Sequence, residues 1–287
     1  MSAFLITGGS GFVGRALARR LDSAGVSVIG LSSSDGDISN QATLDRYRSS
    51  EIQHVFHLAA RSFVPQSWDD PIGFHRVNAV GTLNVLEFCR ERCISLTYVS
   101  AYLYGQPIQQ PIGESHPLVP NNPYALSKVQ AEMACEFYAR THGLQVAVVR
   151  PFNVYGFGQN DNFLIPSILR QVIAASEIKV QDLAPRRDYL YIDDLVELLL
   201  ATLKAPTGYN VYNGGTGSSL SVAEVITAAQ AEAGTTKPVI SGQSIRNHEI
   251  YDTRADIGKA RKELGWAPKV GFCDGIRTIM ARMREAK

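Results

Sequence analysis

The chain has 287 residues, of which 28 are Lys or Arg and 27 are Asp or Glu, so its formal net charge is +1. This length suffices for one large domain, or two closely joined ones, with a buried core. A charge balance this even provides no long-range attraction for a polyanion, which argues against binding to DNA or RNA. Apolar residues make up 45% and charged residues 19% of the chain, as is typical of globular proteins.

Membranes, disulfides and metals are also disfavoured by the sequence. No apolar stretch approaches the roughly 20 residues that span a bilayer, so we expect no membrane partner. The N-terminal segment has no basic region and no small-residue cleavage site, which predicts a cytoplasmic protein. The four cysteines are too scattered for a disulfide framework, and neither they nor the histidines show ligand spacing, so we expect no bound metal.

Short apolar runs rich in β-branched residues alternate with amphipathic segments through the first half of the chain. Runs that are apolar at successive positions are typical of strands buried on both faces, and so of a parallel sheet between two layers of helices. We predict strands at 3–7, 26–31, 54–59, 96–100 and 145–150, and helices at 12–22, 40–50, 78–92 and 123–142. The fold class is therefore α/β, with a doubly wound parallel sheet.

The pattern loosens after about residue 151, because clusters of Asn, Gly and Pro interrupt shorter helices. We predict these helices at 163–175, 193–203, 221–233 and 254–264. This half is interpreted as a smaller lobe that receives a substrate. We assign 1–152, with returning segments near 186–213, to a dinucleotide-binding domain, and 153–185 and 214–287 to the substrate-binding lobe.

A glycine-rich turn, TGGSGFVG, lies between the first predicted strand and the first predicted helix. It places Gly8, Gly11 and Gly14 at a spacing of three. Glycine suits this place because the backbone must turn tightly and let a pyrophosphate approach the helix N–H groups. We therefore predict a Rossmann-type dinucleotide site, in which Phe12 and Val13 also contact the cofactor.

The choice between NAD and NADP stays open at the second strand. The strand ends at Leu31 and is followed by three serines, with neither an acid for the ribose hydroxyls nor an arginine for a 2′-phosphate. Ser32 would accommodate either cofactor. Asp37 would accept a hydrogen bond from the adenine amino group while Ile38 packs on the ring; the alternative for Asp37 is a turn or capping residue.

A tyrosine and a lysine four residues apart, Tyr124 and Lys128, lie at the start of the helix predicted over 123–142. This spacing places the phenol and the ammonium on one helical face. A nearby cation favours the phenolate and so lowers the pKa of a tyrosine. Ser100 ends the fourth strand, at the edge where parallel sheets gather their ligand groups, so we expect the three side chains to form one site.

Eight segments, in chain order, are TGGSGFVG, HLAA, VNAVGTLNVLEFCR, VSAYLYG, NPYALSK, RPFNVYGFGQ, RRDYLYIDDLVE and TRADIGKARKELGWAP. Together they resemble the extended short-chain dehydrogenase/reductases of the NAD-dependent epimerase/dehydratase family, over nearly the whole chain. The resemblance implies that Tyr124 is the acid/base and that Lys128 holds the nicotinamide ribose and lowers the pKa of the tyrosine. It also implies that Ser100 hydrogen-bonds the reacting hydroxyl or carbonyl.

The resemblance further implies contacts to the cofactor and to a nucleotide-diphosphate sugar. The residues that would border the cofactor are Asn78, Leu58, Ala59 and Ala60. Asn153, Arg187 and Arg246 resemble residues that hold the substrate diphosphate, which suits arginine because its planar fork donates two parallel hydrogen bonds. For Arg246 the alternative is an exposed loop arginine, and for Asn153 and Arg187 a surface or core role.

The reaction implied is hydride transfer at C4 of the sugar. A 4,6-dehydratase is disfavoured, because dehydratases of this family carry one or two acids where Ala101 and Tyr102 stand here. A 4-epimerase and a 4-ketoreductase of 4-keto-6-deoxyhexoses need only the Ser-Tyr-Lys triad, so both alternatives stay open. The segment at 57–71 is similar to the reductases, whereas RRDYLYIDDLVE and GGTGSSLSVAEVI are more like the epimerases.

Two further expectations concern catalysis and assembly. Some relatives bind the dinucleotide without catalysis and act as regulators, but these usually lack the Tyr or the Lys. The segments 78–92 and 123–142 are apolar on more than one stripe and so need a partner besides the sheet. In relatives the equivalent helices pair across a two-fold axis, so we expect a homodimer.

Overall fold

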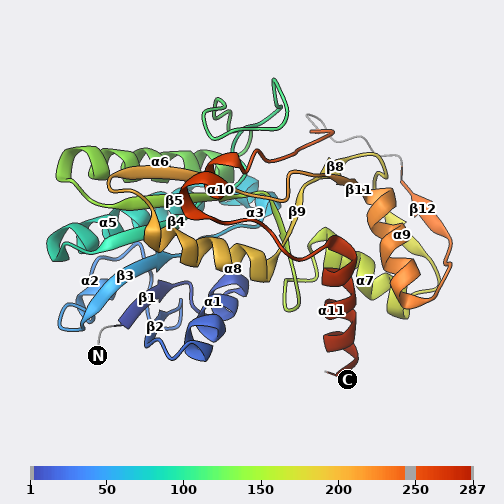
Figure 1. The fold of residues 1–287 in the computed structure, drawn as a ribbon, viewed down its shortest axis with the longest axis horizontal. Helices are drawn as coiled ribbons and strands as arrows, with labels where there is room; N and C mark the ends of the chain where they lie inside the picture. Colours follow the sequence, from blue (N-terminus) through green and yellow to red (C-terminus); the bar gives the residue numbers. More distant parts are fainter. Residues whose placement is uncertain (1–2, 243–249, 286–287) are drawn as a thin grey trace.

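A six-stranded parallel sheet forms the centre of the molecule (Figure 1). The computed structural model describes residues 3–242 and 250–285. The strand order is β10-β5-β4-β3-β1-β2. The strands are β1 (Ala3–Thr7), β2 (Val28–Leu31), β3 (Ile52–His57), β4 (Ser95–Val99), β5 (Val146–Pro151) and β10 (Tyr209–Gly214). The predicted α/β class with a doubly wound parallel sheet is confirmed.

Helices cover both faces of this sheet. One face carries α5 (Gly81–Arg92) and α6 (Pro123–His142), and the other carries α1 (Phe12–Ser23) and α8 (Ile192–Ala201) (Figure 1). Consecutive strand residues supply the two cores in turn: Leu5 packs in the cluster with α5 and α6, and Ile6 in the cluster with α1 and α8. This alternation explains why the strands are apolar at successive positions.

The second half adds helices and short sheets at one end of the central sheet (Figure 1). The helices at that end are α7 (Leu164–Ala174), α9 (Val222–Ala233) and α11 (Phe272–Glu285), whereas α10 (Gly258–Leu264) packs against β10 of the central sheet. Three pairs of strands accompany them: β6 (Asn153–Tyr155) with β9 (Tyr189–Tyr191), β7 (Ile178–Val180) with β12 (Val239–Ser241), and β8 (Arg186–Arg187) with β11 (Leu220–Ser221). Helix α9 begins with a capping box, in which Ser221 and Glu224 each accept a backbone N–H of the other.

Two predicted helices are shorter than expected because other hydrogen bonds compete. In place of a helix over 40–50, only α2 (Ala42–Asp45) forms, and the N–H groups of Tyr47 and Arg48 donate to carbonyls three residues back. In place of 254–264, α10 begins at Gly258, because the N–H groups of Ala255 and Asp256 donate to Asp188 and Ile112. Strand β2 was expected from residue 26 but starts at Val28, because the Val26 N–H donates to the Leu21 carbonyl near the end of α1.

Several elements were absent from the sequence prediction. The strand β10 completes the sheet beside β5, and α11 packs against α9. Between β3 and α5 lie α3 (Val64–Asp69), α4 (Pro71–His75) and the π-helical η1 (Arg76–Val80), and η2 (Thr202–Lys204) follows α8. Within the described ranges, we find no helix with the length and hydropathy needed to cross a bilayer.

Candidate active site

The turn between β1 and α1 can be built only with glycine at two positions. Gly8 has φ +74°, and a Cβ there would lie 2.8 Å from the Ala59 nitrogen. A Cβ on Gly14 would overlap the Gly8 carbonyl oxygen. Gly11 caps α1 without any side-chain acceptor, so the first N–H groups of the helix, at Phe12 and Val13, have no acceptor from the cap. The bare N-terminus is the arrangement that accepts a pyrophosphate.

The segment that follows β3 is fixed against this turn by a chain of hydrogen bonds. Thr7 Oγ1 lies 2.6 Å from His57 Nδ1 and accepts the Ala59 N–H at 3.2 Å. The other ring nitrogen of His57 lies 3.0 Å from Thr82 Oγ1 on α5. Leu58, Ala59 and Ala60 are half-buried, and their backbone borders the glycine turn.

Asn78 lies beneath the same segment, and its amide is fully engaged within the protein. Its Nδ2 donates to the Arg61 carbonyl and to Ser127 Oγ, and its Oδ1 accepts the Arg61 N–H at 2.9 Å. The side chain is 1% exposed. Asn78 therefore holds the loop after Ala60 against α6, which places that loop beside the expected cofactor.

A carboxylate that the sequence analysis did not select lies at the end of β2. Asp35 Oδ2 accepts hydrogen bonds from both the N–H and the hydroxyl of Ser32, at 2.8 and 2.7 Å. These bonds lower the pKa of Asp35. The expectation that no acid stands at this place is thus corrected, because the turn brings Asp35 back onto Ser32. The sequence signal was an acid just beyond the run of serines.

Asp37 lies in a turn, where one of its two carboxylate oxygens accepts a backbone hydrogen bond. Its Oδ1 accepts the Ser39 N–H at 2.9 Å, and this bond lowers its pKa. Its other oxygen lies 3.7 Å from an Arg76 nitrogen. Ile38 is buried, with its Cγ2 against Gly81 at the start of α5.

Ser100, Tyr124 and Lys128 converge where β4 ends and α6 begins. Lys128 Nζ donates to the carbonyl of Val99 at 2.7 Å, directly before Ser100. Ala101, directly after Ser100, packs in one cluster with Tyr124. The Asn122 side chain caps α6 by accepting the Ala125 N–H, which fixes where the helix starts.

Burial controls the charges in this group. Burial raises the pKa of Tyr124, the opposite direction to the lowering expected from Lys128. Burial also lowers the pKa of Lys128 to about 7, against an opposing effect of Glu132. The cation is directed to the Val99 carbonyl and lies 4.3 Å from the Tyr98 ring centroid. The lowering expected from Lys128 is therefore not found: loss of hydration raises the pKa of the phenol, and the cation is engaged with other groups.

The Ser100 hydroxyl is the unpaired donor of the site. The residue is 4% exposed, and its Oγ has no hydrogen-bond partner among the described residues. A buried hydroxyl without a partner costs about 1–3 kcal/mol. Its backbone N–H is satisfied by Val149, so only the side chain is left to bind a ligand.

Two of the three expected diphosphate ligands come together on β6 and β8. Asn153 is half-buried and donates its backbone N–H to the Asp188 carbonyl at 3.0 Å. Arg187 Nη1 donates to the carbonyls of Arg186 and Ile250. Burial raises the pKa of Tyr102 and Arg187 opposes this rise, which places the guanidinium near the end of β4. The third expected ligand, Arg246, lies outside the described residues.

Asp188 was missed although it adjoins Arg187 in the sequence. Its buried carboxylate accepts the N–H groups of Thr216, Gly217 and Ala255, at 2.7, 2.9 and 3.0 Å, and the Thr216 hydroxyl. Burial raises its pKa, and these hydrogen bonds oppose the rise. Asp188 thus ties the strand that carries Arg187 to two distant segments.

A buried ion pair lies one helical turn beyond Lys128. Arg150 donates from Nε and Nη2 to Glu132, with its shortest bond at 2.6 Å, and from Nη1 to the hydroxyl of Tyr104. Tyr104 in turn donates to Asn213 on β10. A charged residue inside the apolar strand VAVVRP is the sequence signal that would have revealed this network. Across the described part of the chain, no group of three or more His, Cys, Asp or Glu side chains is placed to hold a metal ion.

Comparisons with known proteins agree with this geometry. A GDP-6-deoxy-D-mannose reductase from Pseudomonas aeruginosa is 31% identical over 247 residues, covering 80% of this chain and 81% of the relative. A UDP-glucose 4-epimerase from Thermotoga maritima, solved with UDP-glucose, superimposes with a TM-score of 0.92 at 26% identity, covering 100% of this chain and 99% of the other. RMD from Pseudomonas aeruginosa, complexed with NADPH, gives 0.91 at 30% identity, covering 99% and 100%.

The sequence pattern described as "NAD dependent epimerase/dehydratase family" matches residues 4–215, from β1 to the end of β10. These residues include the glycine turn, the convergent Ser, Tyr and Lys, and the strands that carry Asn153 and Arg187. The chain therefore belongs to the NAD-dependent epimerase/dehydratase family.

Proposed function

We propose that the protein binds a nicotinamide dinucleotide and catalyses oxidation–reduction at C4 of a nucleotide-diphosphate sugar, acting in the cytoplasm. The observation that carries this proposal is the buried, unpaired Ser100 hydroxyl beside Tyr124 and Lys128. The net reaction is that of a 4-epimerase or of a 4-ketoreductase. Relatives with both kinds of name match the chain along most of its length.

The turn formed by Gly8, Gly11 and Gly14 fits the pyrophosphate of such a cofactor, since Cβ atoms at Gly8 and Gly14 would collide with neighbouring backbone and force the turn open. Phe12, Val13, Ser32, Ile38 and the backbone of 58–60 would border the rest of the dinucleotide. Ser100, Tyr124 and Lys128 would border a nicotinamide ring at the end of β4, and the ring would supply the hydride chemistry at C4. Asp35 favours NAD, because its carboxylate suits ribose hydroxyls and repels a 2′-phosphate.

Three side chains of the protein act on the C4 oxygen. The Tyr124 phenolate takes the hydroxyl proton when the alcohol is oxidised, and the phenol returns it when the ketone is reduced. Ser100 donates a hydrogen bond to the same oxygen and holds it within reach. Lys128, when protonated, stabilises the phenolate and holds the nicotinamide ribose.

The substrate diphosphate would be bound by Asn153 and Arg187, with Arg246 as a third ligand. Segments 153–185 and 214–287 would then form the substrate-binding lobe. The residues after Ser100 do not support a 4,6-dehydratase, because neither Ala101 nor Tyr102 carries a carboxylate. The Tyr102 hydroxyl instead donates a hydrogen bond to the Gly105 carbonyl at 2.7 Å.

The first test replaces the acid/base. Tyr124→Phe should lower kcat by 10²- to 10⁴-fold while cofactor binding stays as in the wild type, because only the hydroxyl is lost. Tyr102→Phe is the matched control, since its hydroxyl bonds to the backbone, and its turnover should stay near the wild-type value. Unchanged turnover in Tyr124→Phe would refute the assignment, and a protein that binds cofactor but shows no turnover with any nucleotide sugar would be a regulator.

The second test separates the two net reactions by near-ultraviolet absorbance. A ketoreductase consumes reduced cofactor when a nucleotide 4-keto-6-deoxyhexose is added, whereas an epimerase interconverts ordinary hexose nucleotides with no net change in absorbance. Panels with UDP, GDP, dTDP and CDP sugars, each with NADH and NADPH, identify the nucleotide and the cofactor in the same experiment.

A further inference from the structure

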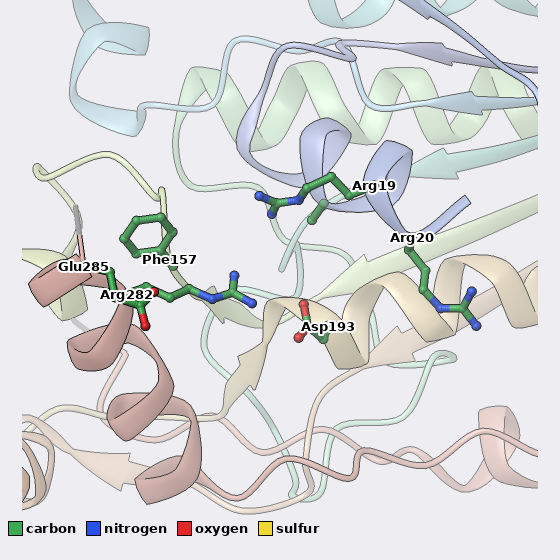
Figure 2. A pocket seen from close by; sticks show the side chains of 7 residues that line it. Arg19, Arg20, Phe157, Asp193, Arg282 and Glu285 are labelled. Carbon is green, nitrogen blue, oxygen red and sulfur yellow. The ribbon is translucent and has the colours of Figure 1, made fainter. Parts of the chain in front are cut away.

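A groove of about 650 Å³ lies between α1, α8 and α11 (Figure 2). The side chains that line it include Arg19, Arg20, Phe157, Asp193, Arg282 and Glu285. None of the proposed catalytic, cofactor or substrate residues is among them. Its volume falls within the range of small-molecule sites, roughly 300–1,000 Å³.

Two arginines of this groove have no hydrogen-bond or ion-pair partner among the described residues. Arg20 forms an ion pair with Glu197 at 2.6 Å. By contrast, neither Arg19 nor Arg282 forms a hydrogen bond or ion pair with any other residue that the structure describes; Arg282 lies only over the Phe157 ring, 5.9 Å from its centroid. In Figure 2 the guanidinium groups of Arg19 and Arg282 extend toward the same space from α1 and α11.

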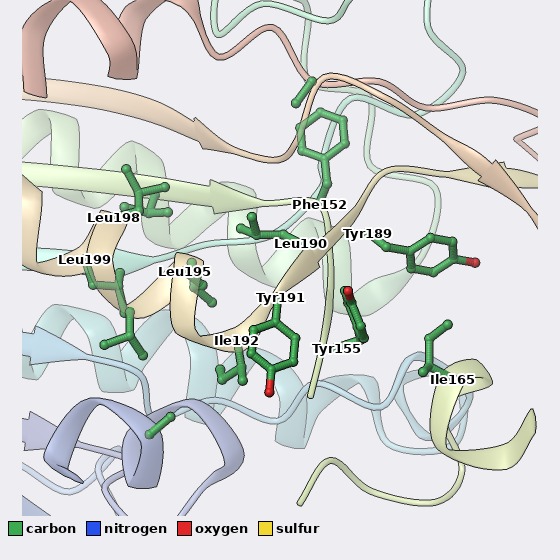
Figure 3. Packing of buried hydrophobic residues seen from close by; sticks show 14 of the residues in the cluster. Phe152, Tyr155, Ile165, Tyr189, Leu190, Tyr191, Ile192, Leu195, Leu198 and Leu199 are labelled. Carbon is green, nitrogen blue, oxygen red and sulfur yellow. The ribbon is translucent and has the colours of Figure 1, made fainter. Parts of the chain in front are cut away.

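A buried tyrosine hydroxyl lies beneath the lining of the groove, within the electrostatic influence of these arginines. Tyr191 ends β9 and is 2% exposed, and its hydroxyl has no hydrogen-bond partner among the described residues. Figure 3 shows this hydroxyl directed toward the side of α1. Burial raises the pKa of Tyr191, and the charge of Asp193 adds to this rise. The charges of Arg282 and Arg19 oppose it, so the charged groups of the groove act on the phenol.

Two carboxylates also line the groove, that of Asp193 at the start of α8 and that of Glu285 at the end of α11. Ionised carboxylates accept hydrogen bonds and cannot donate them. The groove therefore presents two unpaired cationic forks and one hydroxyl as donors, with two anionic acceptors beside them. A ligand that matches these groups carries both an anionic group and hydroxyls.

We propose that this groove binds a phosphorylated sugar, with its phosphate between Arg19 and Arg282. The phosphate also accepts the Tyr191 hydroxyl, and a sugar hydroxyl donates to Asp193. A guanidinium fork matches two phosphate oxygens at once, which makes arginine the preferred partner of this group. The site stands apart from the candidate active site and does not depend on the function proposed above.

The test measures binding of two probes, glucose 1-phosphate and inorganic phosphate, to the full chain by titration calorimetry at low ionic strength. Both should saturate, with glucose 1-phosphate the tighter. Arg19→Ala and Arg282→Ala should each weaken glucose 1-phosphate about tenfold. Arg284→Ala, two residues along α11 from Arg282 and outside the lining of the groove, is the matched control and should bind as the wild type.

Two further variants test the hydroxyl and the carboxylate. Tyr191→Phe should weaken both probes about fivefold. Asp193→Asn should bind inorganic phosphate more tightly, since an anion is removed, and lose the preference for glucose 1-phosphate. The proposal is overturned if neither probe saturates, or if Arg19→Ala and Arg282→Ala both keep wild-type affinity. Binding that is lost in Arg187→Ala but kept in both groove variants also overturns it, by placing the probe in the active site.

Discussion

The carboxylate of Asp35 lies just beyond the end of β2, fixed by two hydrogen bonds from Ser32, and dinucleotide folds bind the adenosine ribose near the end of this strand. A negative charge at this place repels the 2′-phosphate of NADP. We therefore expect NAD to bind at least about tenfold tighter than NADP, a difference of about 1.4 kcal/mol. Asp35→Asn should bring the ratio of the two dissociation constants, measured by calorimetry, closer to one, whereas Asp45→Asn, at an exposed position in α2, should leave the ratio unchanged. An unchanged ratio in Asp35→Asn would remove Asp35 from the cofactor site.

Two histidines within the sheet make the protein sensitive to acid. Burial lowers the pKa of both His54 and His57 to about 3, whereas an unfolded histidine titrates near 6.5. Between these values the unfolded chain binds protons that the native state excludes, so the free energy of unfolding falls as the pH falls from 6.5 toward 3. Each histidine should remove about 2 kcal/mol between pH 7 and pH 5.

Urea unfolding at pH 7 and pH 5 checks this prediction. His54 is held by the hydroxyls of Ser95 and Thr97, so His54→Gln keeps a polar group there while removing the titration. The loss of stability between the two pH values should be about 2 kcal/mol smaller in this variant. The exposed His142→Gln serves as the control. An equal loss in His54→Gln and the wild type would show that His54 is protonated in the native state.

At the residue scale, the sequence located side chains whose chemistry is marked by spacing, and not those whose role depends on distant partners. Ser100, Tyr124 and Lys128 are brought together as expected, although their catalytic roles stay a prediction. Asp188 bonds to residues 28 and 67 positions away, at Thr216 and Ala255, which no local pattern reveals.

The glycine turn is the element on which cofactor binding should depend most. Gly14→Ala places a methyl group against the carbonyl of Gly8, so the turn must open and the cradle is lost. We expect the affinity for the dinucleotide to fall at least about tenfold. Gly30→Ala is the matched control, because no atom lies within 4 Å of a Cβ at this position in β2. Dinucleotide affinities measured by calorimetry compare the two, and equal affinities would place the cofactor elsewhere.

At the element scale, the sequence predicts a boundary when the signal for it lies in the element itself, and not when a distant contact sets it. Helix α6 carries its own start signals, Asn122 and Pro123, and its predicted span 123–142 is confirmed. Helix α11 has apolar residues at Ile276, Ile279 and Met280, a periodicity that was present in the sequence and overlooked. The start of α10 could not be foreseen, since it is fixed by contacts from Asp188 and Ile112.

At the scale of the whole molecule, α5 and α6 leave large apolar side chains uncovered. Leu83 on α5 is 40% exposed, and Met133 and Phe137 on α6 are 64% and 57% exposed. We expect this face to be covered by a second copy of the chain, so that light scattering at micromolar concentration gives the mass of a dimer. Phe137→Glu should shift the mass toward the monomer.

Ile108→Glu provides the control for this experiment. Ile108 is 80% exposed but lies outside α5 and α6, in the segment between β4 and α6, so the variant should stay dimeric. A wild-type protein that scatters as a monomer would refute the homodimer.

The position of β10 in the sheet has a consequence for how the protein folds during synthesis. The ribosome releases β1 to β5 once residue 151 has emerged, but β5 then forms an edge of the sheet until β10, at 209–214, arrives. All six residues of β5 are buried in the finished protein, and all but Arg150 are apolar, so this temporary edge exposes apolar side chains and an unpaired backbone. The nascent chain therefore carries an aggregation-prone edge strand while some sixty further residues are translated. Chaperones would protect the strand during this time.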